Sequence, residues 1–224
     1  MGSEMCIRDR IRTAFFDLLS QHDWDEISLA KVAEASGVKL SELRGAFDGK
    51  VAMVEHFMRE IDTSVLDEID ADVAEELPRE RLMDILLSRF DALAPHKDAV
   101  RSIAKAAKTD LSIAAQLNHV ALVSMTWMLN AANIETGGLK GAVKVQGVAM
   151  VYAKVLRVWL NDDESMAKTM AALDKELRKG ESNMRRVERV QNMLGPLKSL
   201  KSFRRSRRSE QKFDDANTVD GASL

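Results

Sequence analysis

The chain has 224 residues, of which 46% are hydrophobic and 30% are charged, the balance of a folded globular protein rather than a disordered one. Its formal net charge of −2 gives no overall positive excess that would by itself indicate nucleic-acid binding. A single cysteine, Cys6, excludes an intrachain disulfide and a cysteine metal cluster. No apolar run reaches the roughly 18–20 residues of a membrane span, and no signal peptide is visible. We therefore expect a cytoplasmic protein.

Residues 1–9 are set apart from the fold because they include MCIRDR, which looks like a translated sequencing-library adapter. Helical spacing begins directly after them. The apolar residues recur at i, i+3, i+4, i+7 and i+8, which predicts a first helix that ends near residues 20–22. These apolar residues are Ile11, Ala14, Phe15, Leu18 and Leu19.

Residues 27–57 carry the most informative pattern of the chain, two short helices separated by a turn and followed by a longer helix. Ser28 can cap a helix over residues 29–36, because its hydroxyl accepts a backbone N–H. Gly37 can end that helix in the left-handed conformation. A third helix is predicted over residues 40–46, and a fourth runs from Lys50 past Ile69. Two helices joined by a tight glycine turn can place one helix in the major groove of DNA.

The rest of the chain keeps a helical period up to about residue 180. Pro78 and Pro95 fall at helix boundaries, Asp110 is a plausible helix cap, and Gly137–Gly138 interrupts the pattern. No segment shows the two-residue alternation of a strand, so the sequence predicts an all-α fold. The helices expected here cover about residues 82–93, 100–107, 111–128, 139–160 and 163–179.

From residue 181 onward the helical pattern weakens and the sequence becomes polar and basic. Residues 196–212 contain seven Lys or Arg and one acidic residue, whereas residues 1–50 contain seven Lys or Arg and nine acidic residues. We expect residues 181–224 to be largely disordered. Because the positive charge lies in this tail, strong electrostatic affinity for DNA is not expected from the N-terminal unit.

The segment from Ser28 to Lys50 resembles the helix-turn-helix of TetR-family transcriptional regulators. The family pattern places Ser or Thr at the cap, then an aliphatic–Ala pair, Gly-Val at the turn, Leu in the recognition helix, Phe and Lys. The resemblance covers about residues 10–180, and it implies a DNA-binding domain at 10–56 and a helical effector and dimerisation domain at 57–180. The matching residues are Ser28, Val32, Ala33, Gly37, Val38, Leu43, Phe47 and Lys50.

The resemblance also implies which residues contact DNA. The groove-facing residues are Lys39, Ser41, Glu42 and Arg44, and the phosphate contacts are Ser28 and Lys50. Two positions that are usually aromatic hold Arg44 and Ala46 instead, so packing against the backbone sugars is lost. Glu42 would repel phosphate unless it accepts a hydrogen bond from a cytosine amino group. The alternative is an inherited fold that no longer binds DNA.

That alternative has a specific form. Residues 93–104 and 151–177, above all the WLNDD turn, are similar to TetR-like lipid-binding accessory proteins of ubiquinone biosynthesis. In that group the helix-turn-helix is degenerate and a C-terminal amphipathic helix meets the membrane. Here the membrane-binding helix would be residues 184–208, in which apolar residues lie among seven arginines and two lysines. The intact Gly-Val turn and Lys50 favour the regulator.

Residue types predict two further sites. Met is adaptable and Trp is bulky, so both suit an apolar effector pocket, although ordinary core is the alternative reading. Small residues let another helix approach closely, and the last two helices of the resembled family pair across a two-fold axis. We therefore expect a homodimer through residues 139–160 and 163–179, with internal packing as the alternative. The pocket residues are Met58, Phe90, Met125, Trp127, Met128 and Trp159, and the interface residues are Gly141, Gly147, Ala153, Met166, Met170 and Leu173.

The sequence contains no nucleophile–base pair, metal-ligand cluster or phosphate-binding loop, so we predict no catalytic residues, no metal and no cofactor. The expected function is that of a homodimeric repressor that binds a double-stranded DNA operator. A small apolar effector would release it by favouring another arrangement of the dimer.

Overall fold

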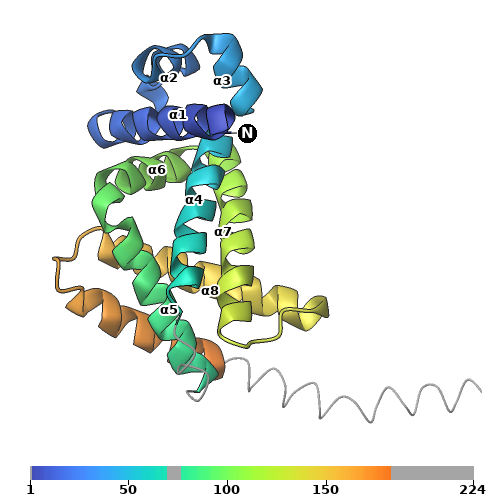
Figure 1. The fold of residues 1–224 in the computed structure, drawn as a ribbon. Coiled ribbons are helices and arrows are strands. Elements are labelled where there is room, and N and C mark those ends of the chain that lie inside the picture. Colours follow the sequence, from blue (N-terminus) through green and yellow to red (C-terminus); the bar gives the residue numbers. More distant parts are fainter. Residues whose placement is uncertain (1, 70–76, 183–224) are drawn as a thin grey trace, which may run out of the picture. The chain divides into compact units, whose positions relative to one another are not determined.

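A computed structural model describes residues 2–69 and 77–182 of the chain. All regular structure in these two ranges is helical, which confirms the all-α prediction (Figure 1). A further helix starts at residue 167 and continues to residue 182. The other helices are α1 (Gly2–Gln21), η1 (Trp24–Glu26), α2 (Leu29–Ser36), α3 (Leu40–Ala46), α4 (Lys50–Asp67), α5 (Pro78–Leu93), η3 (Ala94–His96), α6 (Lys97–Thr109), α7 (Leu111–Ala131) and α8 (Gly138–Trp159).

Helices α1, α2 and α3 form the predicted three-helix unit, and local signals set its boundaries. The Ser28 hydroxyl accepts a hydrogen bond from the Lys31 N–H at 3.1 Å, which caps α2. Gly37 ends α2 with φ of 64°, a left-handed conformation that costs a glycine little. Val32 and Leu43 are almost fully buried between the helices. The sequence therefore predicted both the caps and the buried face of this unit.

Helix α4 leaves the three-helix unit and runs beside α7 (Figure 1). The apolar spacing predicted that this helix would continue past Ile69, but it ends at Asp67. The Asp110 carboxylate caps α7 by accepting the backbone N–H groups of Ser112 and Ile113, at 2.7 and 3.2 Å. Pro78 opens α5, where its missing N–H costs no hydrogen bond.

Helix α8 and the helix after it are joined by a capped turn, as predicted. The Asp162 carboxylate accepts hydrogen bonds from the Thr169 N–H at 2.7 Å and from the Thr169 hydroxyl at 2.8 Å. The helix begins at residue 167, four residues later than the predicted start at 163. Leu173 and Leu177 bury its inner face.

Up to residue 177, the described residues form one compact unit of the chain. The predicted boundary between residues 56 and 57 falls inside α4, so the two predicted parts share a continuous helix and a continuous core. None of the described helices is long and apolar enough to cross a membrane. The predicted disorder of residues 181–224, and the amphipathic segment at 184–208, lie almost entirely outside the described residues.

Candidate DNA-reading face and effector cavity

The residues that were predicted to read DNA lie at the N-cap of α3, which is Lys39, and on α3 itself. Lys39, Ser41, Glu42 and Arg44 are all exposed, whereas Leu43, on the opposite face of the same helix, is 1% exposed. This separation follows from the helical period, which turns one side of α3 toward the core and the other toward solvent.

Two of the charged residues on this face already have partners in the chain. The Glu42 carboxylate accepts the Lys39 N–H at 2.7 Å, so it closes the first turn of α3. The Arg44 guanidinium donates to Asp48 at 2.5 Å in an exposed pair. Such a pair is worth little in water, and phosphate can therefore replace Asp48 at small cost. Ser28 is exposed, but its hydroxyl oxygen serves the α2 cap.

Lys50 differs from the other predicted DNA contacts because it is half-buried. Its ammonium donates to the backbone carbonyls of Trp24 and Ile27, at 2.7 and 3.0 Å, and lies 4.6 Å from the centre of the Trp24 ring. Burial lowers the pKa of Lys50, and the nearby Asp25 carboxylate opposes part of that effect. Two of its three donors are thus committed to fastening the start of α4 to η1.

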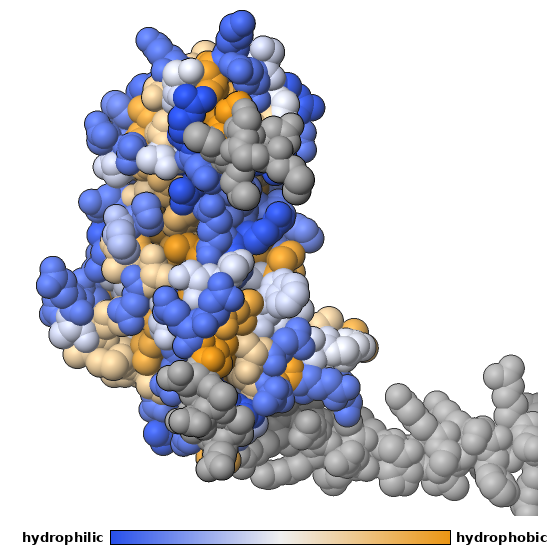
Figure 2. Space-filling view, viewed as in Figure 1, coloured by the Kyte–Doolittle hydropathy of each residue, from blue (hydrophilic) through white to orange (hydrophobic). Residues whose placement is uncertain are grey.

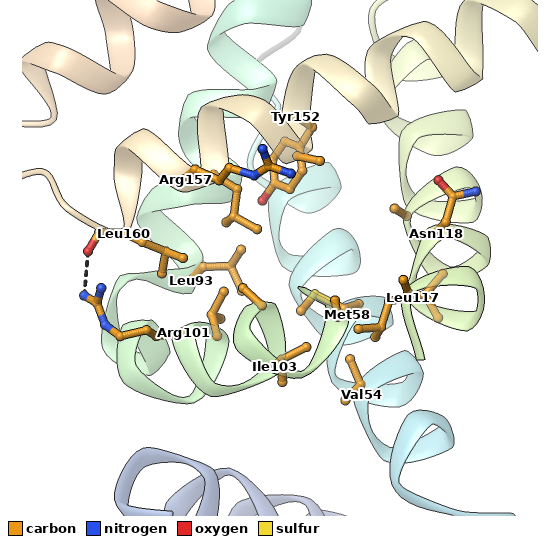
Figure 3. A pocket seen from close by; sticks show the side chains of 18 of the residues that line it. Val54, Met58, Leu93, Arg101, Ile103, Leu117, Asn118, Tyr152, Arg157 and Leu160 are labelled. Carbon is orange, nitrogen blue, oxygen red and sulfur yellow. Dashed lines mark hydrogen bonds between the residues drawn. The ribbon is translucent and has the colours of Figure 1, made fainter. Parts of the chain in front are cut away.

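A cavity of about 590 Å³ lies among α4, α5, α6, α7 and α8 (Figure 3). Its size is within the range of small-molecule sites. Apolar side chains make up most of its wall. Those labelled in Figure 3 are Val54, Met58, Leu93, Ile103, Leu117 and Leu160.

Of the six residues predicted to line an effector pocket, only Met58 lines this cavity. Trp127 is 57% exposed and lies on the outside of α7. The other four fill the hydrophobic core, because large side chains at the buried phase of a helix pack against neighbouring helices before they can line an open space. These core residues are Phe90, Met125, Met128 and Trp159.

A buried polar network forms one wall of the cavity. The Arg89 guanidinium donates to Asp62 at 2.8 Å, to Tyr152 at 2.5 Å and to Ser124 at 3.3 Å. The Ser124 hydroxyl donates to the other Asp62 oxygen at 2.5 Å. Burial raises the pKa of Tyr152, so its phenol stays neutral and accepts from Arg89. The network ties α4, α5, α7 and α8 together.

Besides Arg89, four cationic side chains line the cavity, and none of them was a predicted site residue. Arg101, Lys105 and Lys108 follow an i, i+4, i+7 spacing on α6, and Arg157 comes from α8. All four are exposed. None of the residues that line the cavity is an aspartate or glutamate. The i, i+4, i+7 spacing was visible in the sequence, but nothing there showed that a cavity opens beside it.

Four of the six predicted interface residues are at least partly accessible to solvent, and the other two are buried. Gly147 and Met166 are half-buried, whereas Ala153 and Met170 are exposed. Leu173 is fully buried in its own chain. Gly141 is also buried, and a Cβ atom there would lie 2.0 Å from the Thr136 backbone, so its small size serves an internal turn. Leu173 and Gly141 thus correspond to the internal-packing alternative.

Within residues 2–69 and 77–182, no three His, Cys, Asp or Glu side chains converge in a way that could hold a metal ion. The polar sites described above are the exposed residues of α3, the buried Arg89 network and the cationic edge of the cavity.

The fold is that of TetR-family transcriptional regulators. A TetR transcriptional regulator from Nitrosomonas europaea ATCC 19718 aligns with a TM-score of 0.61 at 20% identity, over 78% of this chain and 97% of that one. Another, from Rhodococcus sp. RHA1, gives a TM-score of 0.57 at 17% identity, over 79% and 97%. A TetR-family regulator from Streptomyces coelicolor gives 0.50 at 16% identity, over 89% and 99%. No protein-family model and no curated sequence match the chain.

Proposed function

We propose that this chain, which has the TetR fold, is a DNA-binding transcriptional regulator and acts as a repressor that a small apolar effector releases. The observation that carries the proposal is the exposure of Ser41 and Arg44 on α3, and of Lys39 at its N-cap, while Leu43 of the same helix is buried. A helix held in this way can enter the major groove and bring its outer side chains to the base edges and phosphates.

Helix α4 supports a link between the effector cavity and the DNA-reading unit. Its first residue, Lys50, is fastened to η1, and its middle carries Val54 and Met58 on the cavity wall. Lys105, at the cavity edge, also forms an ion pair with Asp23 beside η1. A ligand that binds more tightly to one position of α4 or α6 would change which orientation of the three-helix unit α1–α3 is most populated.

Apolar residues on the outside of α8 support a homodimer. Leu139, Val143 and Met150 are 84%, 54% and 62% exposed and share one face of the helix. Figure 2 shows that hydrophobic side chains reach the surface at several places among hydrophilic ones. We propose that α8 and the following helix pair across a two-fold axis. Two α3 helices would then lie about 34–36 Å apart, one turn of DNA.

The function is tested by selecting operator fragments from genomic DNA with the full chain and measuring their affinity as salt is varied. We expect affinity to fall as salt rises, because phosphate contacts release counterions. Arg44→Ala should weaken binding by about 1–3 kcal/mol if the guanidinium reads a base. If it contacts a phosphate, the salt slope should fall by about 1.

Arg59→Ala is a matched control for Arg44→Ala. Both side chains are 71% exposed, and each pairs with a carboxylate four residues away, Arg59 with Glu55 and Arg44 with Asp48. Arg59 lies on α4, outside the reading face, so its loss should leave operator binding unchanged. Equal effects of the two substitutions, or no fragment bound even at low salt, would contradict the proposed function.

A further inference from the structure

We infer that the ligand of the cavity is an anionic amphiphile, with its hydrocarbon chain inside and its acidic head group at the edge between α6 and α8. The inference rests on the proposed effector role of this cavity, and it adds the charge of the ligand and its orientation. It follows from the distribution of apolar and charged side chains around one space.

The inner wall favours hydrocarbon. Val54, Leu93 and Ile103 are buried side chains that face the cavity together with Met58 and Leu117 (Figure 3). Filling such a space with a hydrocarbon chain removes apolar surface from water on both sides.

The polar groups of the inner wall are already hydrogen-bonded within the chain and do not need a polar ligand atom as a partner. Arg89 already donates to Asp62, Tyr152 and Ser124, and Ser124 donates to Asp62. A satisfied network of this kind loses hydrogen bonds if a ligand head group competes for them. The hydrocarbon end of a ligand therefore suits this wall better than its charged end.

The edge of the cavity is positive. Arg101 is partly occupied, since it donates to the Leu160 carbonyl and lies 3.7 Å from Asp98, and Lys105 is paired with Asp23. Lys108 and Arg157 form no ion pair with a carboxylate of the described residues. Two uncommitted cations beside an apolar space, with no acidic residue on its wall, match a carboxylate better than a neutral or cationic head.

The experiment compares three ligands that share one chain: dodecanoate, 1-dodecanol and dodecyltrimethylammonium. Each is dialysed to equilibrium against the full chain at low salt and below its micelle-forming concentration. We expect dodecanoate to bind at least about tenfold more tightly than dodecanol, a difference of about 1.4 kcal/mol. The cationic ligand should bind most weakly. Added salt should narrow the preference, because the edge cations are exposed.

The combined variant Lys108→Gln, Arg157→Gln should lower the preference for dodecanoate over dodecanol to about twofold or less, with the affinity for dodecanol unchanged. Lys140→Gln with Lys175→Gln is the matched control, since both lysines are exposed and neither lines the cavity. Circular dichroism melting of each variant verifies that it is folded.

Equal binding of dodecanoate and dodecanol, binding of neither, or an unchanged preference in the Lys108/Arg157 variant would overturn the inference. The operator assay on the same preparation separates it from the proposed function. Operator binding without dodecanoate binding refutes the ligand class and leaves DNA binding standing. A charge preference without operator binding supports the ligand class and refutes the regulatory role.

Discussion

Arg89 and Asp62 form an ion pair inside the core, with the Arg89 Nε 2.8 Å from an Asp62 carboxylate oxygen. Arg89 is 2% exposed and Asp62 is 6% exposed, so water cannot replace either partner. Although burial alone would lower the pKa of Arg89, Tyr152 and Asp62 together raise it, and the guanidinium remains charged. Removing one partner would therefore leave an uncompensated charge inside the core.

We expect Arg89→Met to cost about 3–5 kcal/mol of folding free energy, measured by urea unfolding. The cost arises from the unpaired Asp62 carboxylate more than from the lost hydrogen bonds. The double variant Arg89→Met, Asp62→Leu should therefore be more stable than Arg89→Met alone. Additive losses in the double variant would show that the two residues do not act as a pair.

At the scale of elements, the sequence predicted most helices to within a few residues, because caps and breakers are local. Ser28, Gly37 and Asp110 each act on their own turn, and each is found where the pattern placed it. The end of α4 at Asp67 was missed, since the apolar spacing continues to Ile69 after the backbone leaves the helix.

The cavity could be predicted less well than the helices, because its wall joins side chains from five helices. One local signal was present in the sequence: Asp62 and Arg89 lie among the buried, mostly apolar positions of α4 and α5. A charge at such a position indicates a buried partner on another helix. The exposed residues of α3, by contrast, could be predicted from the sequence. Once Leu43 is placed in the core, the helical period turns Ser41, Glu42 and Arg44 toward solvent.

The turn between α2 and α3 provides a prediction at this scale. Gly37→Ala should destabilise the protein by roughly 1 kcal/mol, because φ of 64° strains any residue with a Cβ atom, although nothing lies within 4 Å of that atom. Gly45→Ala is the matched comparison. Gly45 lies within α3 with equally open surroundings and no positive φ, so alanine should stabilise by about 0.5–1 kcal/mol. Thermal melts that show the same sign for both would contradict this account.

At the scale of the whole molecule, assembly is the property that the outer face of α8 predicts. We expect the protein to be a dimer by light scattering coupled to gel filtration. Val143→Glu with Met150→Glu should convert it to a monomer, because two charges would enter an apolar interface. The monomer should also lose operator affinity, since only a dimer engages two half-sites.

Leu111→Glu is the control for the α8 substitutions. Leu111 is 87% exposed, but it lies at the start of α7, away from the α8 face. This variant should remain dimeric. A dimer in which α8 substitutions have no effect would place the interface elsewhere.

The packing of α1 determines whether the N-terminal helices can be separated from the rest of the protein. Phe16 of α1 lies 3.9 Å, ring centre to ring centre, from Phe57 of α4, and the His96 ring of η3 contacts both. The Ser102 hydroxyl of α6 donates to the His22 carbonyl at 3.0 Å. A chimera that joins residues 10–56 to the remaining helices of another protein with the TetR fold would break these contacts and expose aromatic surface. If the proposed DNA binding is correct, transferring its specificity to another protein requires either moving α6 together with α1 or exchanging only the exposed residues of α3.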